Sequence, residues 1–70
     1  MVKLSITFGR RIRSLRERKK FSQEEFAETV NLDRTYISGI ERGVRNPTLS
    51  TIQRLAQGLG ISLQELMKGL

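Results

Sequence analysis

The chain has 70 residues, 37% of them apolar, and this length allows one domain with a small core. It contains no cysteine and no histidine, which excludes a disulfide framework and a metal site built from those residues. The segment Met1–Thr7 has no apolar run long enough for a signal peptide or a membrane span, so we expect a cytoplasmic protein.

The net charge of +6 is distributed unevenly along the chain. Residues 1–21 hold eight basic residues and one acidic residue, whereas residues 46–70 hold two basic residues and one acidic residue. The N-terminal part of the chain is therefore strongly positive and the C-terminal part is nearly neutral. Positive charge concentrated in this way favours a polyanionic partner, either nucleic acid or an anionic membrane surface.

The first helix is predicted to run from about Ser5 or Thr7 to Lys19, because apolar residues recur there with the period of one buried helical face. These residues are Phe8, Ile12 and Leu15. A second helix is predicted over residues 23–30. Ser22 is suited to be its N-cap, and Glu25, three residues later, completes a capping box. The inward side of this helix carries Phe26, Ala27 and Val30.

A sharp turn leads into a third helix, which we expect to run from Arg34 to Arg42. Asn31 suits the turn because asparagine tolerates the left-handed backbone that such a turn needs. Leu32 follows as an apolar plug, Asp33 can cap the third helix, and Gly43 can end it. Residues 23–42 are therefore predicted to form a helix-turn-helix.

The third helix has two different faces. Ile37 and Ile40, three residues apart, turn one face toward the core. The opposite face is expected to present to solvent Arg34, Thr35, Ser38 and Gly39, flanked by Tyr36 and Arg42. A glycine inside a helix costs about 1 kcal/mol of helix propensity, so we interpret Gly39 as a place where another surface approaches closely. The first residues of such a helix can enter the major groove of DNA.

Two further helices are predicted in the nearly neutral part of the chain. Thr48 can cap a helix that ends at Gly60, and Ser62 with Glu65 forms a second capping box before a last helix. Their apolar residues at helical spacing are Leu49, Ile52, Leu55, Ala56 and Leu59, and then Leu63, Leu66 and Met67. No segment alternates as a strand would, so the fold class is all-α, a single compact five-helix domain over residues 1–70.

These residues coincide with the motifs of one family. The motifs are Ser22-Gln23, Ala27, Asn31-Leu32, Tyr36-Ile37, Ile40-Glu41-Arg42-Gly43, Asn46-Pro47-Thr48-Leu49 and Leu59-Gly60-Ile61-Ser62. Through them the chain resembles the phage-repressor (Cro/C1-type, XRE) helix-turn-helix regulators. The run Leu32–Arg42, followed by Arg45-Asn46, more narrowly resembles the controller proteins of restriction–modification systems. Lys20 and Asn31 depart from the family pattern, in which glycine is common at both positions.

The resemblance implies a transcription regulator that binds double-stranded DNA with its third helix in the major groove. Base edges would be contacted by Arg34, Thr35 and Ser38. The DNA backbone would be contacted by Gln23, Tyr36, Arg42, Arg45 and Asn46. The backbone contacts would hold the protein in register, whereas the base contacts would read the sequence.

Each of these residues also has a plain structural interpretation. Arg34 can sit in solvent opposite Glu28, and Tyr36 can be a half-buried packing residue. The pair Arg45-Asn46 can simply shape the loop that follows the third helix, and Gln23 can be no more than a first-turn residue.

Two groups of basic residues have different expected roles. In the family a glutamate at the position of Glu41 pairs with an arginine of the first helix, so the resemblance implies a partly buried, structural ion pair between Arg16 and Glu41. The other basic residues of the run Arg10–Lys20 spread around the exposed arc of the helix. Most of them are expected to be solvated, and about half to contribute only long-range attraction to DNA. Removing the charge of Arg11 or Arg18 is expected to weaken binding modestly for all sequences alike.

A single helix-turn-helix domain contacts only about half of a DNA-binding site, so we expect a homodimer on a palindromic operator. Residues 49–70 are the expected dimerisation region, because little charge opposes docking there and three apolar residues exceed what so small a core needs. These residues are Leu66, Met67 and Leu70. The alternative is that they complete the core of their own protomer.

Other functions find little support in the sequence. Without histidine, cysteine or clustered carboxylates there is no nucleophile–base pair and no metal cage, so we expect no enzyme, no cofactor and no small-molecule ligand. Membrane binding by the first helix is disfavoured because its apolar side is needed for the core. A phage-type repressor and an antitoxin-type autoregulator stay open beside the controller protein, as do the operator and the direction of regulation.

Overall fold

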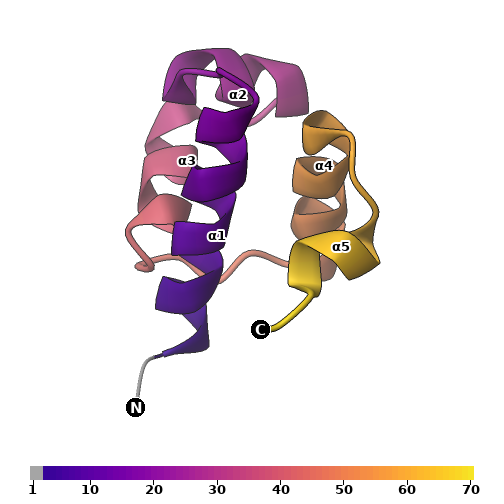
Figure 1. The fold of residues 1–70 in the computed structure, drawn as a ribbon. Helices are drawn as coiled ribbons and strands as arrows, with labels where there is room; N and C mark the ends of the chain where they lie inside the picture. The colour runs from indigo at the N-terminus through magenta and orange to yellow at the C-terminus, as the bar shows by residue number, and fades with distance from the viewer. Residues whose placement is uncertain (1–2) are drawn as a thin grey trace.

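The computed structural model describes residues 3–70, and this part of the chain contains five α-helices and no β-strand (Figure 1). The helices are α1 (Leu4–Arg18), α2 (Gln23–Val30), α3 (Arg34–Glu41), α4 (Leu49–Leu59) and α5 (Leu63–Met67). The all-α, five-helix prediction is confirmed. α1 begins slightly earlier than predicted, and α3 ends one residue earlier because Arg42 is its C-cap.

The predicted helix caps are confirmed by their hydrogen bonds. The Ser22 hydroxyl accepts the Glu25 N–H at 3.0 Å, and the Glu25 carboxylate accepts the Ser22 N–H at 2.8 Å. The bond that the Ser22 backbone N–H donates to the Glu25 carboxylate, and next the Ser22 side chain beside that carboxylate, lower the pKa of Glu25. Asp33 accepts the Thr35 N–H at 2.8 Å where α3 begins. The later caps that form as predicted are Thr48 before α4 and the Ser62–Glu65 capping box before α5.

Two turns use a left-handed backbone at residues other than glycine. Lys20, after α1, has a φ of 65°, and Asn31, after α2, has a φ of 57°. The turn at Asn31 is closed by the Leu32 N–H, which donates to the Ala27 carbonyl at 2.9 Å. Both residues therefore adopt the conformation for which the family more often uses glycine, at some cost in backbone energy.

The helices pack around one core (Figure 1). α1 and α3 lie side by side, α2 crosses their upper ends, and α4 and α5 lie on the other side of the molecule. The buried apolar residues are Phe8, Ile12, Phe26, Ala27, Val30, Ile37, Ile40, Leu55, Ala56, Leu59 and Leu66. All five helices contribute to this set, so the position of α3 is fixed by the rest of the domain.

Two expectations about the C-terminal third are wrong. Leu66, expected in a dimer interface, is fully buried because α5 folds back and inserts this side chain into the protomer's own core. Leu49, expected on the apolar side of its helix, is 78% exposed. It is the first residue of α4, and the core lies further along that helix, at Leu55 and Leu59.

Candidate nucleic-acid interface

A buried ion pair joins the first helix to the end of α3. Arg16 Nε lies 2.6 Å from Glu41 Oε2, and Arg16 Nη2 donates to Glu41 Oε1 at 3.0 Å. The two side chains are 9% and 3% exposed. Arg16 also donates to the Phe21 carbonyl at 2.8 Å. The hydrogen bond with Glu41 raises the pKa of Arg16 above its ordinary value. The predicted Arg16–Glu41 pair is confirmed as a structural contact that fixes α3 against α1.

Gln23 lies at the start of α2 and is tied to the same pair. Its amide Nε2 donates to Glu41 Oε1 at 3.1 Å, and its side chain is half-buried. Gln23 is therefore more than a first-turn residue, because it links the beginning of α2 to the end of α3. The first N–H groups of a helix point outward and attract anions, so the phosphate contact expected at Gln23 stays a prediction that this placement permits.

The face of α3 opposite the core is arranged as expected at its N-terminal end. Ile37 and Ile40 are buried in the core. Arg34 and Thr35 are exposed, and Ser38, one turn further along, is half-buried. Among residues 3–70 the acidic partners in ion pairs are Glu17 and Glu41, so no ion pair ties Arg34 to Glu28. Arg34 and Thr35 are thus presented together, next to the turn.

Gly39 was expected to face solvent, and this is wrong. Gly39 is buried because the side chain of Arg45 lies across it, and a Cβ added at Gly39 would come within 2.7 Å of Arg45 Cγ. The guanidinium of Arg45 continues over the Tyr36 ring, 5.8 Å from its centroid, at the distance of a cation–π contact. The surface that approaches Gly39 closely is therefore part of the same protomer.

This contact changes the interpretation of Arg45 and Tyr36. Tyr36 is half-buried and packs against the core, as its plain structural interpretation expects, and its ring also supports Arg45. Arg45 does not merely shape the loop, since its side chain returns to the outward face of α3. Arg42 and Asn46 are both exposed beside it. The cationic head of Arg45 is held on the same side of the molecule as the exposed N-terminal end of α3.

Among the basic residues of the run Arg10–Lys20 that were expected to lie on the exposed arc of the first helix, Arg11 is tied to another helix. Arg11 donates to the carbonyl of Glu65 at 2.8 Å and to that of Leu66 at 3.3 Å. It therefore caps the last turn of α5, where the Glu65 carbonyl also accepts the Lys68 N–H at 3.3 Å. Arg18 is exposed, as expected.

Sequence reasoning missed two further positions that place α3. Arg54 of α4 donates to the carbonyls of Val30 and Asn31, at the turn before α3. Gly9 of α1 faces the end of α3 so closely that a side chain there would overlap the carbonyl of Ile40. The available signals were weak: a single arginine in the nearly neutral part of the chain, and a glycine inside a predicted helix.

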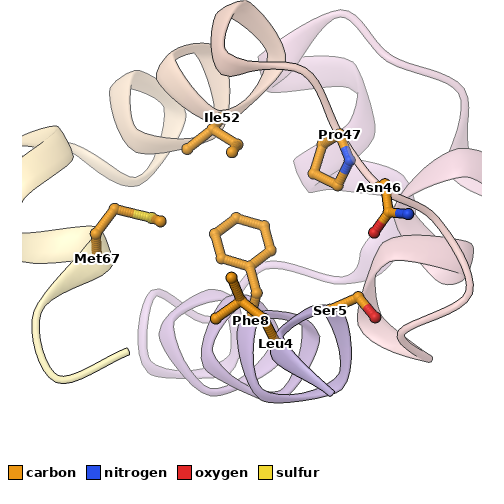
Figure 2. A pocket seen from close by; sticks show the side chains of 7 residues that line it. All are labelled: Leu4, Ser5, Phe8, Asn46, Pro47, Ile52 and Met67. Carbon is orange, nitrogen blue, oxygen red and sulfur yellow. The ribbon is translucent and has the colours of Figure 1, made fainter.

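An apolar groove lies between the beginning of α1, the loop before α4 and the end of α5 (Figure 2). It has a volume of about 140 Å³ and is lined by Leu4, Ser5, Phe8, Asn46, Pro47, Ile52 and Met67. Phe8 points from α1 toward Ile52 of α4, and Met67 and Pro47 face the gap from opposite sides (Figure 2). Leu4, which lines the groove, is exposed, and so are three leucines of the C-terminal third, Leu49, Leu63 and Leu70.

Within residues 3–70, no helix combines the length and the apolar character needed to cross a membrane. The same residues hold no group of three or more acidic, histidine or cysteine side chains placed to bind a metal ion.

The arrangement of the five helices matches that of known proteins. A family model described as helix-turn-helix (HTH_3) matches residues 12–66. The chain belongs to this family. It is similar to the control protein C.MunI of a Mycoplasma species, with 47% identity over 64 residues that cover 90% of this chain and 86% of that protein.

Solved structures of similar proteins agree with this assignment. The restriction-modification controller protein C.AhdI from Aeromonas hydrophila superposes with a TM-score of 0.87 at 46% identity, covering 90% of this chain and 96% of that one. The master regulator for biofilm formation SinR, in complex with DNA, superposes with a TM-score of 0.81 at 31% identity, and the match covers 87% of this chain and 98% of that one. The chain is therefore a DNA-binding transcription regulator of the XRE (Cro/C1) type and not an enzyme.

Proposed function

We propose that this regulator is a restriction–modification controller protein that binds a palindromic operator as a homodimer, with α3 of each protomer in a major groove. The observation that carries the proposal is the outward edge of α3. Arg34 and Thr35 stand exposed at its N-terminal end, while Ile37 and Ile40 anchor its other side in the core. The likeness to C.MunI and C.AhdI supports the controller assignment.

The chemistry of these residues suits the edges of base pairs. An arginine can donate two hydrogen bonds to guanine O6 and N7, which is worth about 1–3 kcal/mol of discrimination. The methyl group of Thr35 can contact a thymine methyl, and the hydroxyl of Ser38 can bond to several bases. We therefore assign sequence reading to Arg34, Thr35 and Ser38.

The surrounding residues are suited to hold the DNA backbone. Gln23 is oriented by Glu41 beside the free N–H groups of α2, and Arg45 is held on the outward face of α3 by Tyr36. The residues that we assign to phosphate and sugar contacts are Gln23, Tyr36, Arg42, Arg45 and Asn46. Such contacts fix register and supply affinity without reading sequence.

A dimer would place two recognition helices about 34 Å apart, one helical turn of DNA. Met67 and Leu70 stay in the proposed interface, whereas the buried Leu66 leaves it. The exposed Leu49 joins them in the same nearly neutral part of the chain, and the groove beside Met67 borders it, with the first turns of α1 on its other side. A second copy can dock there without the charge repulsion that the basic first helix would produce.

The experiment that tests this function is selection of bound duplexes from random DNA with the full chain. We expect an enriched palindrome with half-sites centred about 10–10.5 base pairs apart. Binding to it should fall by about three to five orders of magnitude between 50 and 200 mM salt, since a dimer neutralises several phosphates. Enrichment of a single asymmetric half-site, or of no sequence, would contradict the proposal.

A further inference from the structure

The helix-turn-helix turn is held from outside by one arginine of α4. Arg54 Nη2 donates to the Val30 carbonyl at 3.0 Å and to the Asn31 carbonyl at 2.6 Å. Val30 is the last residue of α2, and Asn31 is the left-handed residue of the turn. Carbonyls at the end of a helix carry a partial negative charge, so a guanidinium is a well-matched partner for this position.

The position of Arg54 is itself fixed by its neighbours on α4. Leu55, the next residue, is fully buried in the core. Gly58, one turn further along, lies so close to α2 that an added side chain would overlap Val30. α4 therefore packs directly against the end of α2, and Arg54 extends from this contact to the turn.

The turn decides the direction in which α3 leaves α2. Its own hydrogen bonds, such as that from Leu32 N–H to the Ala27 carbonyl, hold the end of α2. Asn31 keeps a backbone conformation that is unfavourable for a residue with a side chain. The bond from Arg54 to the Asn31 carbonyl opposes relaxation of this residue, and a change in φ there would swing Arg34 and Thr35 away from their positions.

We propose that Arg54 is a positioning residue for DNA recognition. By holding the turn, it keeps the N-terminal end of α3 at the angle that reads base edges, and it makes no DNA contact of its own. This inference rests on the proposed function. It concerns discrimination between sequences, which needs accurate placement, more than general affinity, which needs only positive charge.

The test compares Arg54→Gln with the unchanged chain on two duplexes, the palindrome recovered by selection and a scrambled duplex of the same length and composition. We expect Arg54→Gln to lose about tenfold on the palindrome, because a charged hydrogen-bond donor is removed from a strained turn. We expect less than about twofold loss on the scrambled duplex, because one distant charge contributes little. All variants are compared at concentrations at which sedimentation shows the same association state.

A matched control is available in Arg11→Gln. Arg11 also donates to two carbonyls at the end of a helix, but that helix is α5, away from the turn. The variant loses the same charge and the same kind of cap. We expect Arg11→Gln to lose affinity by the same factor on the palindrome and on the scrambled duplex.

The salt dependence separates positioning from a direct phosphate contact. Log K falls linearly with log salt, and each phosphate contact that is lost makes this slope shallower by about 0.9. We expect Arg54→Gln to leave this slope unchanged on the palindrome. If the slope of the variant is shallower by about one or more per protomer, Arg54 binds a phosphate, and this result overturns the inference.

The inference is also overturned if Arg54→Gln loses the same proportion of affinity on both duplexes, or if Arg11→Gln is equally selective. If Arg54→Gln does not fold, Arg54→Lys takes its place. Lysine keeps the positive charge but cannot donate in the fixed geometry of a guanidinium. We therefore expect Arg54→Lys to lose about threefold in affinity for the palindrome and none for the scrambled duplex. Any other pattern overturns the inference. If the unchanged chain itself does not prefer the palindrome, the proposed function fails, and this is visible before any variant is measured.

Discussion

The buried Arg16–Glu41 pair should contribute strongly to holding α3 against α1. Breaking a buried pair leaves one charge without a partner, so Arg16→Ala is expected to lower the free energy of unfolding by about 3–5 kcal/mol. Chemical denaturation followed by circular dichroism measures this loss.

Arg13→Ala is the matched control, because it breaks an exposed ion pair with Glu17 on the same helix, at 3.3 Å. Its effect should stay within about 0.5 kcal/mol. Equal losses in the two variants would mean that burial of the Arg16 pair has no energetic consequence.

Gly39 gives a prediction that separates stability from binding. Gly39→Ala gains helix propensity but displaces Arg45 from Tyr36, so the free energy of unfolding should change by less than about 1 kcal/mol. DNA affinity should fall alike for all sequences, because Arg45 is assigned to the backbone. Titration of two unrelated duplexes measures this.

The variant Arg45→Ala supplies the control for that effect. If the alanine at position 39 acts by moving Arg45, it should cost no further affinity once Arg45 has already been truncated. An additional loss in the double variant would show that the added methyl group obstructs DNA directly.

At the scale of helices, the close contact between α1 and α3 depends on Gly9. An alanine there would overlap the Ile40 carbonyl and lie 2.8 Å from the Glu41 carbonyl, and backbone atoms cannot rotate away. We expect Gly9→Ala to lower the free energy of unfolding by about 1–3 kcal/mol despite its better helix propensity. Ser14→Ala, at an exposed site on the same helix, should change it by less than about 0.5 kcal/mol. A more stable Gly9→Ala variant would show that the two helices can separate at no cost.

The helices themselves could be predicted from the sequence because their signals are local. Ser22 with Glu25, Asp33, and Ser62 with Glu65 cap helices within a few residues, and the structure shows each of these caps. Asn31 was predicted in the same way, from the backbone conformation that it tolerates. The Arg16–Glu41 pair spans 25 positions and followed from the family resemblance, not from local pattern.

The remaining contacts depend on which distant segments meet. Arg11 and the Leu66 carbonyl are 55 positions apart, and Arg54 and the Val30 carbonyl are 24 apart. No spacing rule connects such pairs, so Arg11 was expected on the exposed arc of the first helix and Arg54 was missed. Leu66 was placed in an interface for the same reason, since an apolar residue near the chain end has the same pattern whether it faces its own core or a partner.

For the whole molecule, the dimer should depend on the exposed Leu49 and Leu70 and on Met67, which is half-buried and lines the groove. Met67→Glu places a charge beside the groove of Figure 2, where a partner would have to desolvate it. We expect this variant to sediment as a monomer at micromolar concentrations at which the unchanged chain is a dimer. Its binding to the palindrome should weaken far more than its binding to a single half-site.

Gln64→Glu is the control for the added charge, since it lies on the same short helix and is already exposed. It should leave the association state unchanged. An unchanged chain that is monomeric at these concentrations would contradict the dimer, whatever the variants do.

The central claim is that the exposed edge of α3 reads bases through Arg34 and Thr35. The most direct measurement is a parallel selection from random DNA with the unchanged chain and with Arg34→Ala. We predict that the variant recovers the same palindrome with its preference relaxed at one symmetric pair of positions, at a cost of about 1–3 kcal/mol per half-site. An identical set of preferences in both selections would show that Arg34 reads no base and would contradict the account.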